Sequence, residues 1–98
     1  RNTLWLAHAI PNGGGRSVGE AGKLVAEGVK GGIPDVFLPV PRAGCNGLYI
    51  EFKKSGGSPK EDQRCFLNML DEQGFRCYVI NDLNTAKKLF IKYYHGRG

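Results

Sequence analysis

The sequence predicts an α/β domain in which helices flank a mixed β-sheet. Short runs of aliphatic and aromatic residues, typical of strands, are bounded by glycine and proline clusters. Two later segments carry apolar residues at helical spacing behind capping residues. The resulting order is strand, helix, hairpin, helix, strand, helix, which is typical of a sheet with helices packed on it. A chain of 98 residues forms a single domain, residues 1–98, with a modest core.

The first third of the chain contains a strand and a helix weakened by glycine. Residues 4–10 form an apolar run that predicts a short strand, and residues 11–15 are a loop rich in glycine. Residues 17–27 carry apolar side chains at roughly helical spacing, but two glycines lower the helix propensity. Gly28 is the expected C-terminal stop of this helix.

Two apolar runs in the middle of the chain predict an antiparallel hairpin. Residues 33–38 and 48–53 are the strands, and residues 41–47 are the connection. With the midpoint near residues 43 and 44, Asp35 falls opposite Phe52, within a residue or so.

Acidic and basic side chains gather at one end of this hairpin. Because strand side chains alternate between faces, Glu51 and Lys53 share one face of the sheet. A shift of one residue in the loop is enough to place Asp35 on that same face. Two carboxylates and an ammonium would then meet in an oxygen-rich site suited to a hard divalent cation.

The helix after the hairpin is marked by a capping pattern. Ser58 is the expected N-cap, Pro59 occupies the first helical position, and Glu61 completes a capping box. The apolar stripe of this helix places Gln63 on the side that faces the sheet, one turn from the helix start. Gly74 is expected to end the helix.

The C-terminal third predicts one further strand and one further helix. Residues 75–80 are the strand, and either Asp82 or Asn84 caps the helix. Gly96 is expected to end this helix. The side chains expected to face inward are Leu83, Ala86, Leu89, Phe90 and Tyr93, and those expected to face outward are Lys87, Lys88 and Lys92.

Composition and charge indicate which broad class of protein this chain belongs to. No apolar run approaches the roughly 20 residues of a membrane helix, so no membrane partner is expected, and the N-terminal segment is too short for a signal peptide. Three widely spaced cysteines without a CxxC pattern indicate reduced thiols in a cytoplasmic protein. A net charge of +5 suits a polyanionic partner without identifying one.

Four sequence blocks resemble the VRR-NUC domain of the PD-(D/E)xK nuclease superfamily. They are Ile-Pro-Asn-Gly-Gly at 10–14, Ala-Glu-Gly-Val-Lys-Gly-Gly-Ile-Pro-Asp at 26–35, Gly-Leu-Tyr-Ile-Glu-Phe-Lys at 47–53, and Ser-x-x-x-x-Gln at 58–63. The resemblance covers about residues 4–94 and implies a restriction-endonuclease-like fold. It also implies a metal-dependent deoxyribonuclease of the stand-alone phage or bacterial type, acting in the cytoplasm of a bacterial or phage-infected cell.

The resemblance assigns roles to five residues. Asp35 and Glu51 would bind Mg²⁺ or Mn²⁺, and the backbone carbonyl of Phe52 would be a third protein ligand. Lys53 would position the attacking water or stabilise charge on the phosphate, and Gln63 would support the site. Residues expected to contact DNA are Arg16, Lys54, Lys60 and Arg64, which flank this site or lie in the glycine-rich loop.

Stand-alone members of this family resemble Holliday-junction resolvases, so the expected substrate is branched DNA such as a four-way junction, and the expected assembly is a homodimer. Candidate dimer contacts are Leu4, Trp5, Leu6, Tyr93 and Tyr94, which otherwise only complete the core of the monomer. In this family an acidic residue on a helix ahead of the first strand usually completes the site. That helix is either absent or lies upstream of Arg1, and Glu20 or Glu27 would otherwise serve.

Plainer readings remain open for several residues. Glu51 and Lys53 also fit a solvated pair on a strand, and Gln63 fits a structural hydrogen bond to the sheet. His8 and His95 are not expected to be ligands or general bases. The alternative function is a DNA-binding module that keeps a nuclease fold without turnover.

Overall fold

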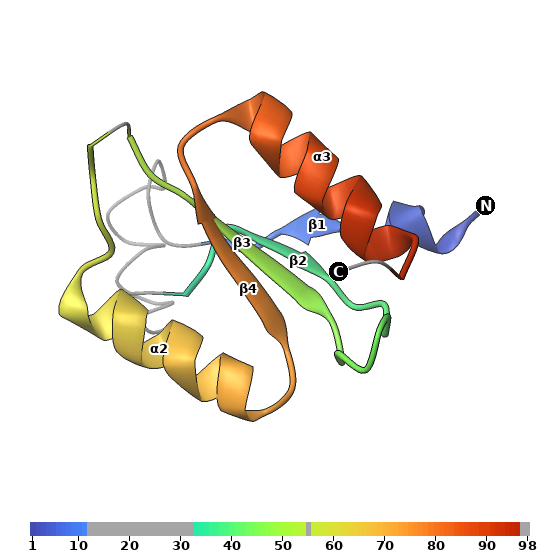
Figure 1. The fold of residues 1–98 in the computed structure, drawn as a ribbon, viewed down its shortest axis with the longest axis horizontal. Helices are drawn as coiled ribbons and strands as arrows, with labels where there is room; N and C mark the ends of the chain where they lie inside the picture. Colours follow the sequence, from blue (N-terminus) through green and yellow to red (C-terminus); the bar gives the residue numbers. More distant parts are fainter. Residues whose placement is uncertain (12–32, 55, 97–98) are drawn as a thin grey trace.

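The sheet has four strands in the order β1-β2-β3-β4 in a computed structural model that describes residues 1–11, 33–54 and 56–96 (Figure 1). The strands are β1 (His8–Ala9), β2 (Val36–Leu38), β3 (Leu48–Phe52) and β4 (Arg76–Ile80). β1 pairs antiparallel with β2, and β2 antiparallel with β3, whereas β4 runs parallel to β3. The predicted mixed sheet is therefore confirmed.

The β2–β3 hairpin closes through a tight turn at Ala43 and Gly44. Arg42 and Cys45 exchange backbone hydrogen bonds of 3.1 and 2.8 Å across this turn. Ala43 and Gly44 both have positive φ angles, 49° and 80°, as a type I′ turn requires. The turn brings Val36 opposite Ile50, which fixes the register of the whole hairpin.

Two helices cover opposite faces of the sheet. α2 (Glu61–Glu72) lies on the face that carries Tyr49 and Glu51, and α3 (Leu83–Tyr94) lies on the other face (Figure 1). Because β3 and β4 are parallel, the chain must cross back from the end of β3 to the end of the sheet where β3 begins, and α2 makes this connection. α2 packs chiefly against β4, so it covers this face of the sheet mainly on the β4 side.

The hydrophobic core lies between α3 and the sheet. Buried apolar residues come from β2 and the segment after it, β3, β4 and α3, and they are Leu38, Val40, Leu48, Ile50, Ile80, Ala86 and Tyr93. The Tyr93 ring is fully buried, and its hydroxyl donates a 2.7 Å hydrogen bond to the Val40 carbonyl. This bond satisfies the polar end of a ring that otherwise fills apolar space.

The N-terminal segment differs from the single strand predicted for residues 4–10. It forms a 3₁₀ helix, η1 (Thr3–Leu6), followed by the two-residue strand β1. The cause is local, because the Asn2 side chain accepts a 3.0 Å hydrogen bond from the Leu4 N–H and starts a turn that apolarity alone does not reveal.

Helix ends were predicted with mixed success. Asp82 caps α3, with its carboxylate accepting 2.8 Å bonds from the Thr85 N–H and hydroxyl, and Gly74 and Gly96 follow the two helices with positive φ. The predicted Ser58 N-cap is wrong, because α2 begins at Glu61 with Lys60 as its N-cap. Leu83, expected to face inward, is 61% exposed.

The predicted helix at residues 17–27 lies outside the described residues. Among the described residues, no helix is long and apolar enough to cross a membrane. All three cysteines are free thiols.

Candidate functional site

The site forms around a buried carboxylate near the end of β3. Glu51 is only 4% exposed, although it is a charged side chain on the face that α2 covers only in part. Lys53 lies two residues further along the same face, as strand alternation predicts. Burial on this scale excludes the reading of Glu51 and Lys53 as a simple solvated pair.

One oxygen of Glu51 is held by two donors and the other by none. Oε2 accepts a 2.6 Å hydrogen bond from Gln63 Nε2 and lies 3.1 Å from Lys53 Nζ. Oε1 is buried and has no hydrogen-bond partner among the described residues. A buried acceptor of this kind is costly to leave unpaired, so Oε1 is a candidate position for a ligand.

Gln63 is fixed by the helix that carries it. Its Oε1 accepts a 3.2 Å hydrogen bond from the Lys60 backbone N–H at the start of α2. With the amide oxygen turned to the helix terminus, Nε2 is directed at Glu51. Gln63 therefore both caps α2 and orients the carboxylate, and the prediction that it faces the sheet is confirmed.

Asp35 reaches the site through the register of the hairpin. Since Val36 pairs with Ile50, Asp35 falls next to Glu51, one residue from the expected position opposite Phe52. Its Oδ2 accepts a 2.9 Å hydrogen bond from the Phe52 N–H. The one-residue shift thus brings both carboxylates to one end of the hairpin.

The surroundings raise the pKa of Glu51 above its ordinary value. Burial is the largest cause, and the negative charge of Asp35 acts in the same direction. Hydrogen bonds from Lys53 and Gln63, with the Lys53 charge, oppose the shift. The charged form of Glu51 is therefore only partly compensated by the described residues, and a bound cation would complete the compensation.

The Phe52 carbonyl is oriented toward the same place. The Lys53 N–H donates a 2.8 Å bond to Ile80 on β4, and the peptide that joins Phe52 to Lys53 is trans. In a trans peptide the C=O points opposite to the N–H, so the Phe52 carbonyl is directed away from β4, to the β2 side where Asp35 lies.

These groups fit a divalent cation. An unpartnered buried carboxylate oxygen, a second carboxylate and a backbone carbonyl are the oxygen donors that Mg²⁺ accepts when water and substrate complete its shell. The described residues contain no cluster of three or more His, Cys, Asp or Glu side chains suited to a metal. Two carboxylates are sufficient for Mg²⁺, but they would not form a structural zinc site.

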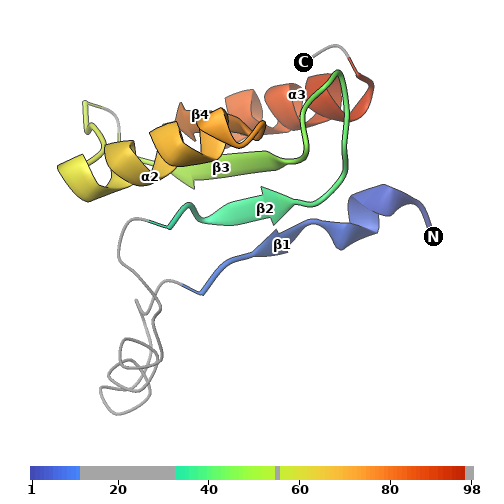
Figure 2. The same cartoon turned by 90° about the horizontal axis from the view of Figure 1, so that it is seen from below.

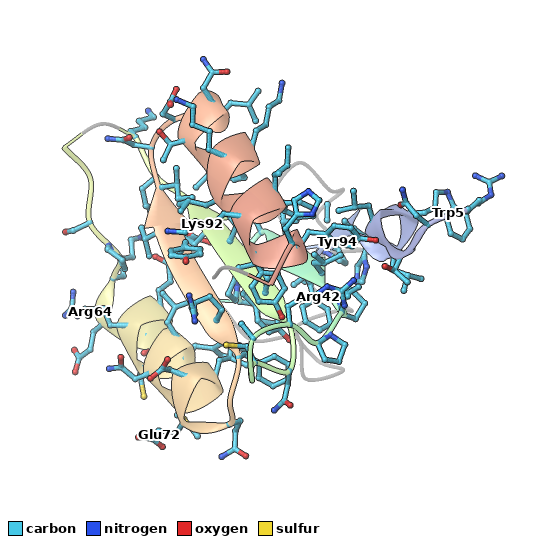
Figure 3. All side chains as sticks on the ribbon, turned by 45° about the vertical axis from the view of Figure 1, so that its right-hand side comes forward. Trp5, Arg42, Arg64, Glu72, Lys92 and Tyr94 are labelled. Atoms are coloured by element: carbon cyan, nitrogen blue, oxygen red, sulfur yellow. The ribbon has the colours of Figure 1, made fainter. Side chains whose placement is uncertain are left out.

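Three of the four basic residues predicted to contact DNA lie on the segment after β3 or at the start of α2. Lys54 and Lys60 are exposed on the segment that joins β3 to α2. Arg64 projects from the first turns of α2, where its guanidinium donates a 2.7 Å bond to the Pro59 carbonyl (Figure 3). Arg16, with the alternative acids Glu20 and Glu27, lies outside the described residues.

Part of the predicted dimer surface is not available. Tyr93 is fully buried, so it completes the monomer core instead. Tyr94 is half-buried, with the Arg42 guanidinium 4.7 Å from its ring centroid, whereas Trp5 is exposed (Figure 3). Leu6 is also exposed.

The sequence reasoning missed the part played by the Lys60 backbone N–H, which holds the Gln63 side chain in place. A glutamine at the third helical position is the available signal, because such a residue can reach back to the N-cap N–H. Ser58 and Glu61 match the more common capping-box pattern, which predicts an N-cap at Ser58 and not the pairing of Lys60 with Gln63.

Comparison with known proteins gives two matches and one negative result. The VRR-NUC domain family matches residues 17–82, well over half of the chain. A solved structure described as a VRR_NUC domain protein is similar over 98% of this chain and 73% of its own, with 26% identity and a TM-score of 0.80. No curated protein matches. The α/β fold is thus the restriction-endonuclease-like fold that the sequence blocks predicted, and this chain belongs to the VRR-NUC domain family.

Proposed function

We propose that this protein is an Mg²⁺- or Mn²⁺-dependent endodeoxyribonuclease that hydrolyses phosphodiester bonds in branched DNA such as Holliday junctions. The observation that carries the proposal is the unpartnered buried oxygen of Glu51 beside Asp35. Membership of a nuclease-related family supports the same class of chemistry.

Asp35, Glu51 and the Phe52 carbonyl would hold the metal ion. When bound, the ion supplies charge neutralisation at the phosphate and lowers the pKa of a coordinated water. Between Asp35 and Glu51 the chain itself provides a concentrated negative charge that favours a cation at this position.

Lys53 and Gln63 complete the site in different ways. Lys53 Nζ, 3.1 Å from Glu51 Oε2, places an ammonium where negative charge develops on the phosphate or where the attacking water is oriented. Gln63 holds Glu51 in one orientation through the 2.6 Å hydrogen bond, so that Oε1 is left for the ion.

DNA binding is expected to draw on a basic surface around the site. Lys54, Lys60 and Arg64 are exposed next to the Glu51 end of β3, and Arg16 lies in the matched part of the chain. Contacts of this type are to phosphates and make affinity depend on salt. A homodimer would supply two sites for the two symmetric cuts of a four-way junction, with Trp5 and Leu6 among its contacts.

Cleavage of a labelled synthetic four-way junction with Mg²⁺ or Mn²⁺ tests the proposal. Asp35→Asn and Glu51→Gln should abolish cleavage and leave DNA binding largely unchanged, because binding depends mainly on phosphate contacts. Wild-type cleavage rates in either variant would refute the site assignment. Binding without metal-dependent cleavage by the native chain would indicate instead a DNA-binding module with a nuclease fold.

Lys53→Ala and Lys54→Ala form a matched pair for the same assay. Removing a preorganised cation at a phosphoryl centre typically slows turnover by on the order of 100-fold or more, so Lys53→Ala should lose far more activity. Lys54 is the control, since it is the adjacent exposed lysine without the Glu51 contact. Equal losses would mean that Lys53 acts only through general charge.

A further inference from the structure

A row of aromatic rings crosses the sheet next to the candidate metal site. Phe37 stacks on Tyr49 with ring centroids 4.3 Å apart and planes inclined by 16°. Phe75 packs edge-to-face against Tyr49 at 5.4 Å on one side. His8 packs against Phe37 at 5.8 Å on the other, with planes inclined by 83°. The row therefore ends at His8 on the edge strand β1.

This row lies on the same face as Glu51 and Lys53. Tyr49 precedes Glu51 by two residues on β3, so both side chains point to one face. Phe37 is the cross-strand partner of Tyr49, and His8 is the cross-strand partner of Phe37, so the face is continuous. At about 3.3 Å per residue, the aromatic row is displaced from Glu51 by roughly 7 Å along the strands.

Within residues 1–11, 33–54 and 56–96, the His8 end of the row is uncovered. His8 is exposed, and α2 packs chiefly against β4, so none of the described helices covers β1 and β2 on this face (Figure 2). The His8 ring is held in place by a 2.8 Å hydrogen bond between Nδ1 and the Leu6 carbonyl. Because a carbonyl oxygen only accepts, Nδ1 is the donor, and the ring is fixed by its own backbone.

We propose that His8, backed by Phe37, is a stacking surface for an unpaired base of the DNA next to the scissile phosphate. This proposal rests on the proposed nuclease function and refines its substrate class to branched DNA in which a nucleotide at the branch point is unpaired, as in a flap or an opened four-way junction. Stacking on exposed rings is available to any base, so the surface selects for an unpaired base and not for a sequence.

A purely structural role accounts for this arrangement less well. Phe37 is already packed by Tyr49 and Phe75, so the core of the row is complete without His8. His8 is exposed and contributes little apolar burial. Its position at the open end of the row, on the face of Glu51 and Lys53, is what a substrate contact requires.

Binding without metal separates this surface from the cleavage reaction. Fluorescence anisotropy in EDTA would compare a DNA that carries a single-stranded flap with a duplex of equal length, for the native chain, His8→Ala and His8→Phe. His8→Ala should weaken flap binding about tenfold and leave duplex binding unchanged, because one stacked base contributes about that factor. His8→Phe keeps an aromatic ring and should restore flap binding.

His95→Ala is the matched control. His95 is an exposed histidine at the end of α3, the helix on the opposite face of the sheet, and its ring packs edge-to-face against Tyr94 with centroids 5.9 Å apart. Its removal should leave the flap-to-duplex ratio unchanged. Circular dichroism melting of each variant verifies that the fold is intact.

A fluorescent base analogue locates the stacked nucleotide. With 2-aminopurine next to the mapped cleavage position, the native chain and His8→Phe should quench its fluorescence, whereas His8→Ala should not. An unchanged flap-to-duplex ratio in His8→Ala, or failure of His8→Phe to restore it, would overturn the stacking surface. Absence of cleavage by the native chain would refute the nuclease proposal, while the flap-to-duplex binding ratio would still test the surface.

Discussion

Replacing Glu51 with glutamine should stabilise the metal-free protein while it abolishes cleavage. The carboxylate is 4% exposed, and its Oε1 is buried without a hydrogen-bond partner among the described residues. An amide of the same shape keeps an oxygen for Gln63 Nε2 and removes the charge beside Asp35. A neutral amide is also far less costly to bury than a carboxylate.

The expected change in the free energy of unfolding on Glu51→Gln is the sum of two opposing contributions. An unpaired buried neutral group costs about 1–3 kcal/mol and a charged one costs more, so the variant, whose amide nitrogen takes the unpaired position of Oε1, recovers the difference between the two. Against this, the substitution loses the ion pair with Lys53, whose side chain is 23% exposed. A partly solvated pair of this kind contributes about 0–1 kcal/mol. The expected net gain is about 1 kcal/mol, which corresponds to a rise in Tm of roughly 4–8 °C for a domain of this size.

The gain in stability from Glu51→Gln should increase as the pH rises. Because folding raises the pKa of Glu51, the protonated group stabilises the native chain fully below the pKa that Glu51 has in the unfolded chain, about 4.5. That stabilisation is lost as the pH rises through the raised folded pKa. The difference in Tm between Glu51→Gln and the native chain should therefore be small at acid pH and grow toward neutral pH.

Thermal denaturation followed by circular dichroism in EDTA, from pH 4.5 to 8, measures this effect. Glu61→Gln is the control, because Glu61 is exposed in the first turn of α2, where a negative charge is favourable and its loss should slightly lower Tm. Added Mg²⁺ or Mn²⁺ should raise the Tm of the native chain and not of Glu51→Gln. A lower Tm for Glu51→Gln at every pH would show that the Lys53 contact outweighs burial and would refute the reasoning.

Three further predictions test other parts of the structure. Ala43→Asn should raise Tm by a few degrees, since Ala43 has a φ of 49° in a turn that prefers Asn-Gly; an unchanged Tm would indicate that the turn costs no strain. Gln63→Ala should slow cleavage and lower Tm by removing the bonds to Glu51 and the α2 terminus. Asn68→Ala, exposed on the same helix, should leave cleavage unchanged and should not lower Tm, since alanine favours the helix. Cys77, half-buried with a pKa raised to about 11 mainly by burial, should react with iodoacetamide at pH 8 much more slowly than exposed Cys65; equal rates would show that β4 opens readily.

The sequence by itself determined which side chains gather at the candidate site and the order of the elements from the β2–β3 hairpin onward. Glu51 and Lys53 share a face because strand alternation depends only on sequence spacing. Gly74 and Gly96 end their helices because a residue with positive φ is needed at those positions and glycine adopts it without strain. These are short-range properties, and they are encoded within a few residues.

Only the tertiary structure decided which groups meet. The position of Asp35 relative to Glu51 depends on one residue of register, which is set by the Ala43–Gly44 turn and by pairing across the sheet. The start of α2 at Glu61 depends on Gln63, which caps the helix and donates a hydrogen bond to Glu51 on β3. The burial of Glu51 and Tyr93 also depends on what packs over them, and packing between distant segments leaves no local pattern in the sequence.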